Sequence, residues 1–229
     1  LGKRVLFDNQ LREPQQAEKF QAAARQYGVA VPSMAMSGFF AQSFLTRDNY
    51  QDLLKDCFQT MKLFGSKVAF LPLGGSGKDW QQEGCAAYQQ MVSRLRTAGE
   101  MAKQEGITIG IRTGMGAKFD KKLLKKVGSS QIKVYYNFQD AADHHRDICK
   151  ELRKLGAQRI VQIHASNTDS VNLQEDLEIN LPKIRKTLDK MKWSGWLVVE
   201  RSRDVKRVRD VKYNFGRNIA YLKQVFQER

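Results

Sequence analysis

The chain has 229 residues, of which 41% are hydrophobic and 28% charged, a composition that suits one large globular domain or two small ones. Apolar residues recur along its whole length without a run of 18, which excludes a disordered chain and a membrane-spanning helix. Thirty-nine Lys and Arg against 24 Asp and Glu give a net charge of +15. This excess favours an anionic ligand, nucleic acid or an acidic partner, but it says nothing about the fold.

The three cysteines, Cys57, Cys85 and Cys149, form no close pair and no Cys-x-x-Cys motif. A disulfide framework and a zinc ribbon are therefore unsupported, and we expect buried free thiols in helices. No signal peptide opens the chain at Leu1. We expect a cytoplasmic protein, with export after removal of an upstream signal as the alternative.

Short β-branched or aromatic runs alternate with amphipathic stretches from end to end, the pattern of βα units that build a parallel sheet. Pro14 suits the first turn of a helix and Asp48 suits an N-cap, while four helices end at glycine. The predicted strands are 3–7, 29–34, 68–71, 107–111, 132–136, 160–164 and 196–200. The predicted helices are 14–27, 48–64, 84–105, 120–127, 141–155, 182–191 and 210–226.

Seven consecutive βα units without a linker predict a single α/β domain over residues 1–229, closed as a (β/α)8 TIM barrel. Such a barrel has one unit more, so we expect the first βα unit to lie upstream of Leu1. An open doubly wound sheet is the alternative, but no Gly-rich fingerprint follows the first strand.

Polar residues follow several of these strands, and in such a barrel the active site lies at the C-terminal strand ends. Asp8, Met36 and Ser37 follow the first two strands. Four later strands end at Arg112-Thr113, Asn137, His164 and Glu200. Polar residues at four strand ends, all at the same opening of the barrel, favour a binding site over residues that merely hydrate loops.

Several segments together resemble the sugar phosphate isomerase/epimerase family, the xylose isomerase-like TIM barrels. They are Thr-Ile-Gly-Ile at 108–111, Lys-Val-Tyr-Tyr at 133–136, Ile-Val-Gln-Ile-His at 160–164 and Gly-Trp-Leu-Val-Val-Glu at 195–200. The resemblance covers residues 3–226. It implies a divalent metal (Mn, Mg, Co or Zn) held by Glu, Asp, His and Glu, with the two glutamates moving a proton next to a carbonyl.

The sequence departs from this family pattern at half of the implied metal ligands. Arg112 stands at the first Glu and Asn137 at the Asp, whereas His164 and Glu200 remain. One carboxylate would replace three, and the permanent charge of Arg112 would repel a dication by several kcal/mol. We hypothesise that the metal is absent and that Arg112 pairs with Glu200; the alternative is that Arg112 turns outward to a loop acid.

Two functions remain open for such a site. In the first, Glu200 and His164 act as base and acid on a sugar or sugar phosphate, and Arg112 stabilises the oxyanion. If a metal is bound after all, His164 and Glu200 would hold it. In the second, the chain is a non-catalytic carbohydrate-binding barrel, a pseudoenzyme.

Further basic residues could bind the substrate. Lys78 lies in a Gly-rich stretch, 74–78, that could touch a phosphate or form a plain mobile loop. Arg201 and Arg203 follow the last strand, where these barrels often bind phosphate. Asn137 could also contact the substrate. His144 and His145 are adjacent on a predicted helix and cannot both face one metal.

Nucleic acid is a separate class of partner, because endonuclease IV is related to this family. That enzyme depends on a His-rich metal cluster, and the chain has three His, so we do not expect metal-dependent DNA cleavage. Charge-driven binding of nucleic acid is the alternative. An unclosed barrel edge would favour a homo-oligomer.

Overall fold

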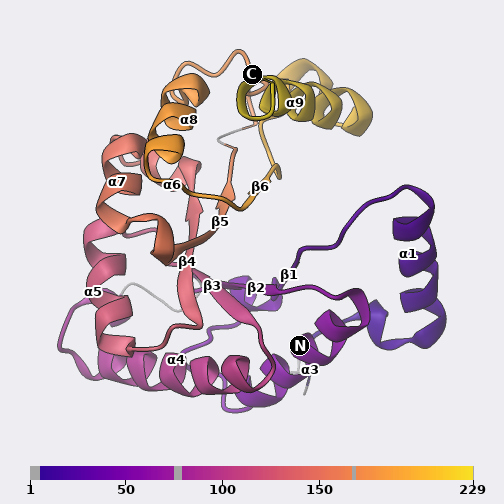
Figure 1. Cartoon of the computed structure of the whole chain (residues 1–229). Coiled ribbons are helices and arrows are strands. Elements are labelled where there is room, and N and C mark those ends of the chain that lie inside the picture. Colours follow the sequence, from indigo (N-terminus) through magenta and orange to yellow (C-terminus); the bar gives the residue numbers. More distant parts are fainter. Residues whose placement is uncertain (1–5, 75–78, 167–168, 229) are drawn as a thin grey trace. The chain divides into compact units, whose positions relative to one another are not determined.

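The computed structural model describes residues 6–74, 79–166 and 169–228, and Figure 1 labels its elements. The strands are β1 (Ser33–Ala35), β2 (Val68–Pro72), β3 (Thr108–Arg112), β4 (Ile132–Asn137), β5 (Ile160–His164) and β6 (Trp196–Val198). The helices are α1 (Pro14–Gln26), α2 (Gly38–Ala41), α3 (Tyr50–Phe64), α4 (Ala86–Gln104), α5 (Ala117–Val127), α6 (Phe138–Ala142), α7 (Ile148–Leu155), α8 (Leu181–Lys190) and α9 (Val211–Phe226).

The chain divides into two compact units, Leu1–Thr113 with Leu123–Lys133, and Gly114–Lys122 with Val134–Arg229. In the first unit, β1, β2 and β3 pair in parallel and in chain order. In the second, β4, β5 and β6 do the same. Parallel neighbours joined through helices are the βα units that the sequence predicts.

Several predicted boundaries shift for identifiable reasons. Residues 3–5 of the first predicted strand lie outside the described residues, and Leu6 and Phe7 are not in a strand. The second strand starts only after Pro32, which has no N–H for the ladder. Helix α3 begins after Asn49 rather than Asp48, and the Asn49 side-chain oxygen accepts a bond from Arg47 instead of capping the helix.

The predicted helix 141–155 is two helices. His145 has φ of 51° in the turn between α6 and α7, a left-handed conformation that a helix cannot continue through. Asp147 then caps α7, because its side chain accepts a bond of 2.9 Å from Lys150 N. His144 and His145 are therefore exposed turn residues and not part of a helix.

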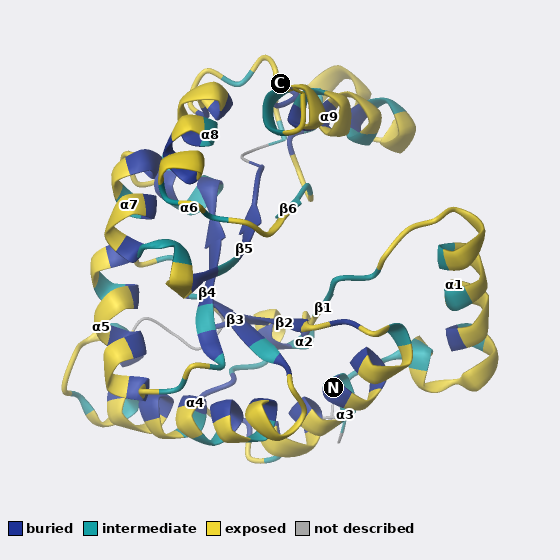
Figure 2. Cartoon of the chain, in the orientation of Figure 1, coloured by how far each residue is buried: buried dark blue, intermediate teal, exposed yellow. Residues whose placement is uncertain are grey.

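The core of the first unit lies between the parallel strands and α4. Ile109, Ile111 and Leu95 are fully buried, and Figure 2 shows the buried stripe that runs along α4. Gly99 permits a close approach, since a Cβ there would lie 2.4 Å from Ser129 Oγ. Trp80 is also completely buried.

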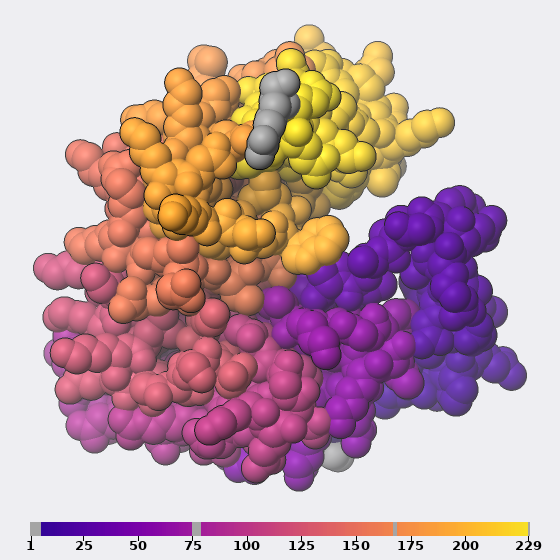
Figure 3. Space-filling view, viewed as in Figure 1, coloured from indigo at the N-terminus to yellow at the C-terminus, as the bar shows by residue number. Residues whose placement is uncertain are grey.

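In the second unit, α7 and α8 bury apolar stripes that include Leu152 and Leu188. Arg185 of α8 donates a bond of 2.7 Å to Val225 O of α9, and the side chains of the two helices form one continuous surface in Figure 3. No helix in the described part of the chain is both long and apolar enough to cross a membrane.

Candidate functional site

Three polar side chains of the second unit meet at the C-terminal ends of adjacent strands. Asn137 ends β4 and His164 ends β5, and the register pairs Asn137 with His164 and His164 with Val198. Asn137 Nδ2 lies 3.4 Å from His164 Nδ1. On the other side of the ring, His164 Nε2 lies 3.6 Å from Glu200 Oε2. The imidazole therefore stands between an amide and a carboxylate.

The amide of Asn137 has one defined orientation. Its Oδ1 accepts a bond of 2.8 Å from Gln139 N at the start of α6. This N-cap bond turns the NH₂ group toward His164. Because an amide nitrogen can only donate, Nδ1 of the neighbouring ring must accept. A neutral His164 then carries its proton on Nε2, the nitrogen that faces Glu200.

His164 and Glu200 differ in their access to solvent. The His164 side chain is 7% exposed, while Glu200 is 61% exposed. The ring of Tyr135 packs edge-on against the imidazole, with centroids 4.8 Å apart. Burial raises the pKa of Tyr135 above its ordinary value, and the negative charge of Glu200 raises that pKa further. The phenol thus stays neutral and supports the ring without competing for its proton.

Strand alternation explains which residues share this face. Tyr135 pairs with Gln162 and Asn137 with His164, so all four lie on the same side of the sheet. Gln162 is fully buried. Tyr135 and Gln162 were not among the predicted site residues, although each lies two positions before Asn137 or His164 on the same face of its strand.

The group does not fit the divalent metal that the family resemblance implies. The Asn137 oxygen caps a helix and its nitrogen cannot ligate a cation. Only one imidazole and one carboxylate remain, short of the oxygen-rich set that such ions prefer. Among the described residues there is no group of three or more His, Cys, Asp or Glu arranged for a metal.

The other predicted site residues are distributed as follows. Arg112 ends β3 in the first unit, where its carbonyl accepts a bond of 3.0 Å from Leu73 N. Thr113 follows it and is buried. The pairing of Arg112 with Glu200 stays a prediction. Lys78 lies outside the described residues.

Arg201 and Arg203 both bind Asp169, which was not among the predicted site residues. Arg203 donates through Nε to Asp169 Oδ1 at 2.9 Å and through Nη2 to Oδ2 at 2.7 Å. Arg201 donates through Nε to Oδ2 at 3.0 Å. The two guanidinium groups hold the pKa of Asp169 at about 2, with the bond from Arg203 as the largest cause.

Buried asparagines fix the loop that carries Glu200 and both arginines. Asn172 and Asn218 donate to Ser202 O at 3.1 and 2.7 Å. Asn214 Oδ1 accepts from Asp204 N at 2.8 Å. Ser202 is fully buried with φ of 69°, a strained backbone that persists only where its surroundings enforce it.

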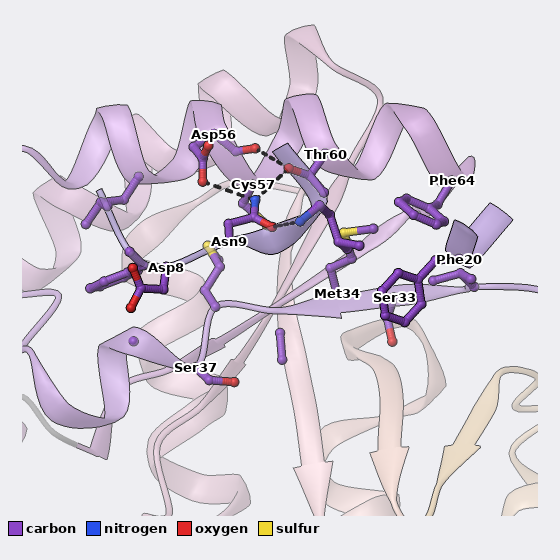
Figure 4. Close-up of a pocket in the computed structure, with 17 residues that line it drawn as sticks. Asp8, Asn9, Phe20, Ser33, Met34, Ser37, Asp56, Cys57, Thr60 and Phe64 are labelled. Atoms are coloured by element: carbon purple, nitrogen blue, oxygen red, sulfur yellow. Dashed lines mark hydrogen bonds between the residues drawn. The ribbon is translucent and has the colours of Figure 1, made fainter. Parts of the chain in front are cut away.

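A separate cavity of about 470 Å³ lies in the first unit, between β1, α1 and α3. Asp8, Met36 and Ser37, which follow the first two predicted strands, line it. Figure 4 shows that Asn9 reaches across to α3, where its Nδ2 donates to Thr60 Oγ1 at 2.8 Å. This cavity is distinct from the Asn137–His164–Glu200 group.

Comparison with solved structures identifies the fold. D-psicose 3-epimerase from Clostridium cellulolyticum H10 superposes with a TM-score of 0.75 at 13% identity, covering 92% of this chain and 83% of that one. A sugar phosphate isomerase/epimerase from Parabacteroides distasonis ATCC 8503 gives 0.72 at 15% identity, covering 90% and 75%. A xylose isomerase domain protein from Planctomyces limnophilus gives 0.70 at 13% identity, covering 94% and 84%.

No curated protein matches the chain. At identities this low the solved structures show a shared fold alone. The family model described as xylose isomerase-like TIM barrel, however, matches residues 4–225, a range that spans both units. The chain therefore belongs to the xylose isomerase-like TIM barrel family, which confirms the resemblance.

Proposed function

We propose that the chain is an isomerase/epimerase-like protein that moves a proton next to the carbonyl of a sugar or sugar phosphate. The observation that carries this proposal is the imidazole of His164, fixed by Asn137 on one nitrogen and facing Glu200 with the other. Solved epimerases that share this fold also support the proposal.

Each residue has a defined part in this proton transfer. The exposed carboxylate of Glu200 takes the proton from the carbon next to the carbonyl, and the electron pair moves onto the carbonyl oxygen. His164 donates its Nε2–H to that oxygen, while Arg112 is the cation we assign to the developing negative charge. Isomerisation follows when Glu200 returns the proton to the former carbonyl carbon while the deprotonated Nε2 of His164 takes the hydroxyl proton from the first carbon, where the new carbonyl forms. Epimerisation follows when a solvent proton reaches the opposite face of the first carbon while Nε2 takes back the proton that it gave to the oxygen.

We further propose that this proton transfer uses no divalent metal, because the donor set does not fit one. Titration with Mn²⁺ or Zn²⁺ should show no stoichiometric binding to the native chain. The double variant Arg112→Glu and Asn137→Asp restores the implied carboxylates and should gain binding. Tight binding by the native chain that Glu200→Gln abolishes would contradict the proposal.

Deuterium exchange tests the reaction itself. D-tagatose, D-fructose and their phosphates are incubated with the chain in deuterated buffer, and exchange at C1 and C3, the carbons beside the carbonyl, is followed by NMR. We expect exchange with at least one sugar and a loss of at least about 100-fold in Glu200→Gln, since removing a general base costs that much. Glu100→Gln, on the exposed face of α4, is the control and should exchange normally.

The alternative is a carbohydrate-binding barrel without turnover, and a specific observation favours it. Of the two glutamates that the family resemblance implies, one is Arg112 here. Calorimetric binding of a sugar without exchange in any variant would support this alternative and contradict the isomerase.

A further inference from the structure

We propose that Arg201 and Arg203, aligned by Asp169, form a clamp for an anionic group on the substrate, a phosphate or a carboxylate carried by the sugar. This inference rests on the proposed function and specifies its substrate class. From the sequence we expected a basic residue after the last strand to bind phosphate. The structure adds that the guanidinium groups of Arg201 and Arg203 are both bound by the carboxylate of Asp169, which lies in another loop.

The hydrogen bonds to Asp169 leave part of each guanidinium group available. Both arginines use Nε and Nη2 for the carboxylate, at distances between 2.7 and 3.0 Å. Among the residues that the structure describes, neither Nη1 group has a hydrogen-bond partner. Paired N–H donors held in a fixed plane match the oxygens of a phosphate or carboxylate.

The charge and exposure of the cluster favour an anion from outside the chain. Two positive groups share one negative group, which leaves one positive charge uncompensated. Asp169 is 16% exposed, while Arg201 and Arg203 are 46% and 35% exposed. The carboxylate is thus less accessible to solvent than the two cations, and an anion from solvent can approach the guanidinium groups.

Contacts other than this ion pair also hold the loop in place. Asn172 and Asn218 donate to Ser202 O, and Val205 N donates to Ser170 O at 3.1 Å. These buried backbone contacts already join the loop after β5 to the loop after β6. The strained φ of Ser202, between the two arginines, indicates a loop conformation maintained for a purpose other than stability.

The position of the clamp fits a substrate that also reaches the imidazole. Asp169 follows β5, the strand that ends at His164, and Arg201 directly follows Glu200. Both loops leave the C-terminal ends of parallel strands, the edge at which such barrels bind substrates. An anionic sugar held here would have its uncharged part directed toward the proton-transfer pair.

Calorimetry with matched ligands tests the clamp. The probes are inorganic phosphate, D-fructose, D-fructose 6-phosphate and D-gluconate, titrated into the native chain and the variants Arg201→Gln, Arg203→Gln and Arg209→Gln. Arg209 lies in the same loop, and its side chain has no partner among the described residues, so its variant removes the same charge outside the clamp. We expect Arg201→Gln and Arg203→Gln to lower the affinity for the preferred anion at least about tenfold. Arg209→Gln should change this affinity less than twofold.

The outcomes separate the two proposals. Preference for fructose 6-phosphate or for gluconate identifies the anionic group. Phosphate binding that depends on Arg201 and Arg203 supports the clamp even if no sugar binds, a result that would contradict only the proposed function. Equal affinity for D-fructose and its phosphate, unchanged in both variants, would overturn the clamp and leave the proposed function standing. No binding of any anion to the native chain would also overturn it.

Discussion

At the scale of single residues, the exchange of a carboxylate for an amide at position 137 has two consequences. The oxygen of Asn137 caps α6 and the nitrogen donates to His164. An aspartate could fill the first role, but not the second, because it offers no N–H. The amide nitrogen of Asn137 thus decides which nitrogen of His164 carries the proton.

We therefore assign Asn137 as a positioning residue and predict that Asn137→Asp moves the His164 proton to Nδ1. The second carboxylate oxygen would need a donor, and Nδ1–H can supply it. Nitrogen-15 NMR of the imidazole checks this prediction. An unchanged tautomer would contradict it.

Replacing Asn137 by alanine separates the two roles. Loss of the N-cap should lower the free energy of unfolding by about 1 kcal/mol. Asn180→Ala removes the equivalent cap of α8, a bond of 2.9 Å to Lys183 N, and should cost the same. Only Asn137→Ala should alter the tautomer of His164 and the rate of deuterium exchange in the sugar. If Asn180→Ala slows that exchange equally, the role of Asn137 is purely structural.

The thiol of Cys57 should be unreactive although it lines the cavity of the first unit. Burial raises its pKa to about 12, and the thiolate is the reactive species. Iodoacetamide at pH 8 should label Cys57 only after unfolding in urea, as read by mass spectrometry. Labelling in the native state at the rate of a free thiol would show that the cavity opens.

At the scale of elements, the loop after β6 depends on α9. Asn218 donates to Ser202 O and accepts from Leu173 N, both inside the second unit. Asn218→Ala leaves the buried N–H of Leu173 unpaired and removes one of the two bonds to Ser202 O, so it should lower the free energy of unfolding by about 1–3 kcal/mol. Gln224→Ala, on the exposed part of the same helix, should change it by less than about 0.5 kcal/mol. Urea unfolding measures both, and equal losses would contradict this account of the loop.

The elements that were predictable from sequence are those whose patterns are local. The strand 160–164 has the observed bounds, because the β-branched residues Ile160, Val161 and Ile163 favour an extended backbone. The break between α6 and α7 was missed, since it depends on a left-handed His145 and on a cap by Asp147. The start of α5 was placed late, because Ala117 N is bonded by Glu151, 34 residues away.

At the scale of the whole molecule, acid should remove the contribution of Asp169 to stability. Its folded-state pKa is about 2, below the ordinary value of 3.8. The contribution is therefore complete above the ordinary value and is lost as the pH falls toward 2. The difference in free energy of unfolding between the native chain and Asp169→Asn should shrink between about pH 4 and pH 2. A difference independent of pH would contradict this assignment.

The family and the strand-end residues were predictable from sequence, because the order of the motifs along the chain indicates the family and the motifs themselves include the ends of the strands. Arg112, Asn137 and His164 do end their strands, with Glu200 following β6. The partners of these residues were not predictable. Asp169 lies in a polar loop that no pattern marks, and its contacts with Arg201 and Arg203 arise only once two loops have folded together.

The cap of α6 also gives the chain an internal reporter. The amide proton of Gln139 is bonded to the same side chain that holds the imidazole. A molecule that pulls the ring away from Asn137 would loosen this side chain and expose that proton to solvent. Its rate of hydrogen exchange would then follow occupancy of the site, without any need for turnover.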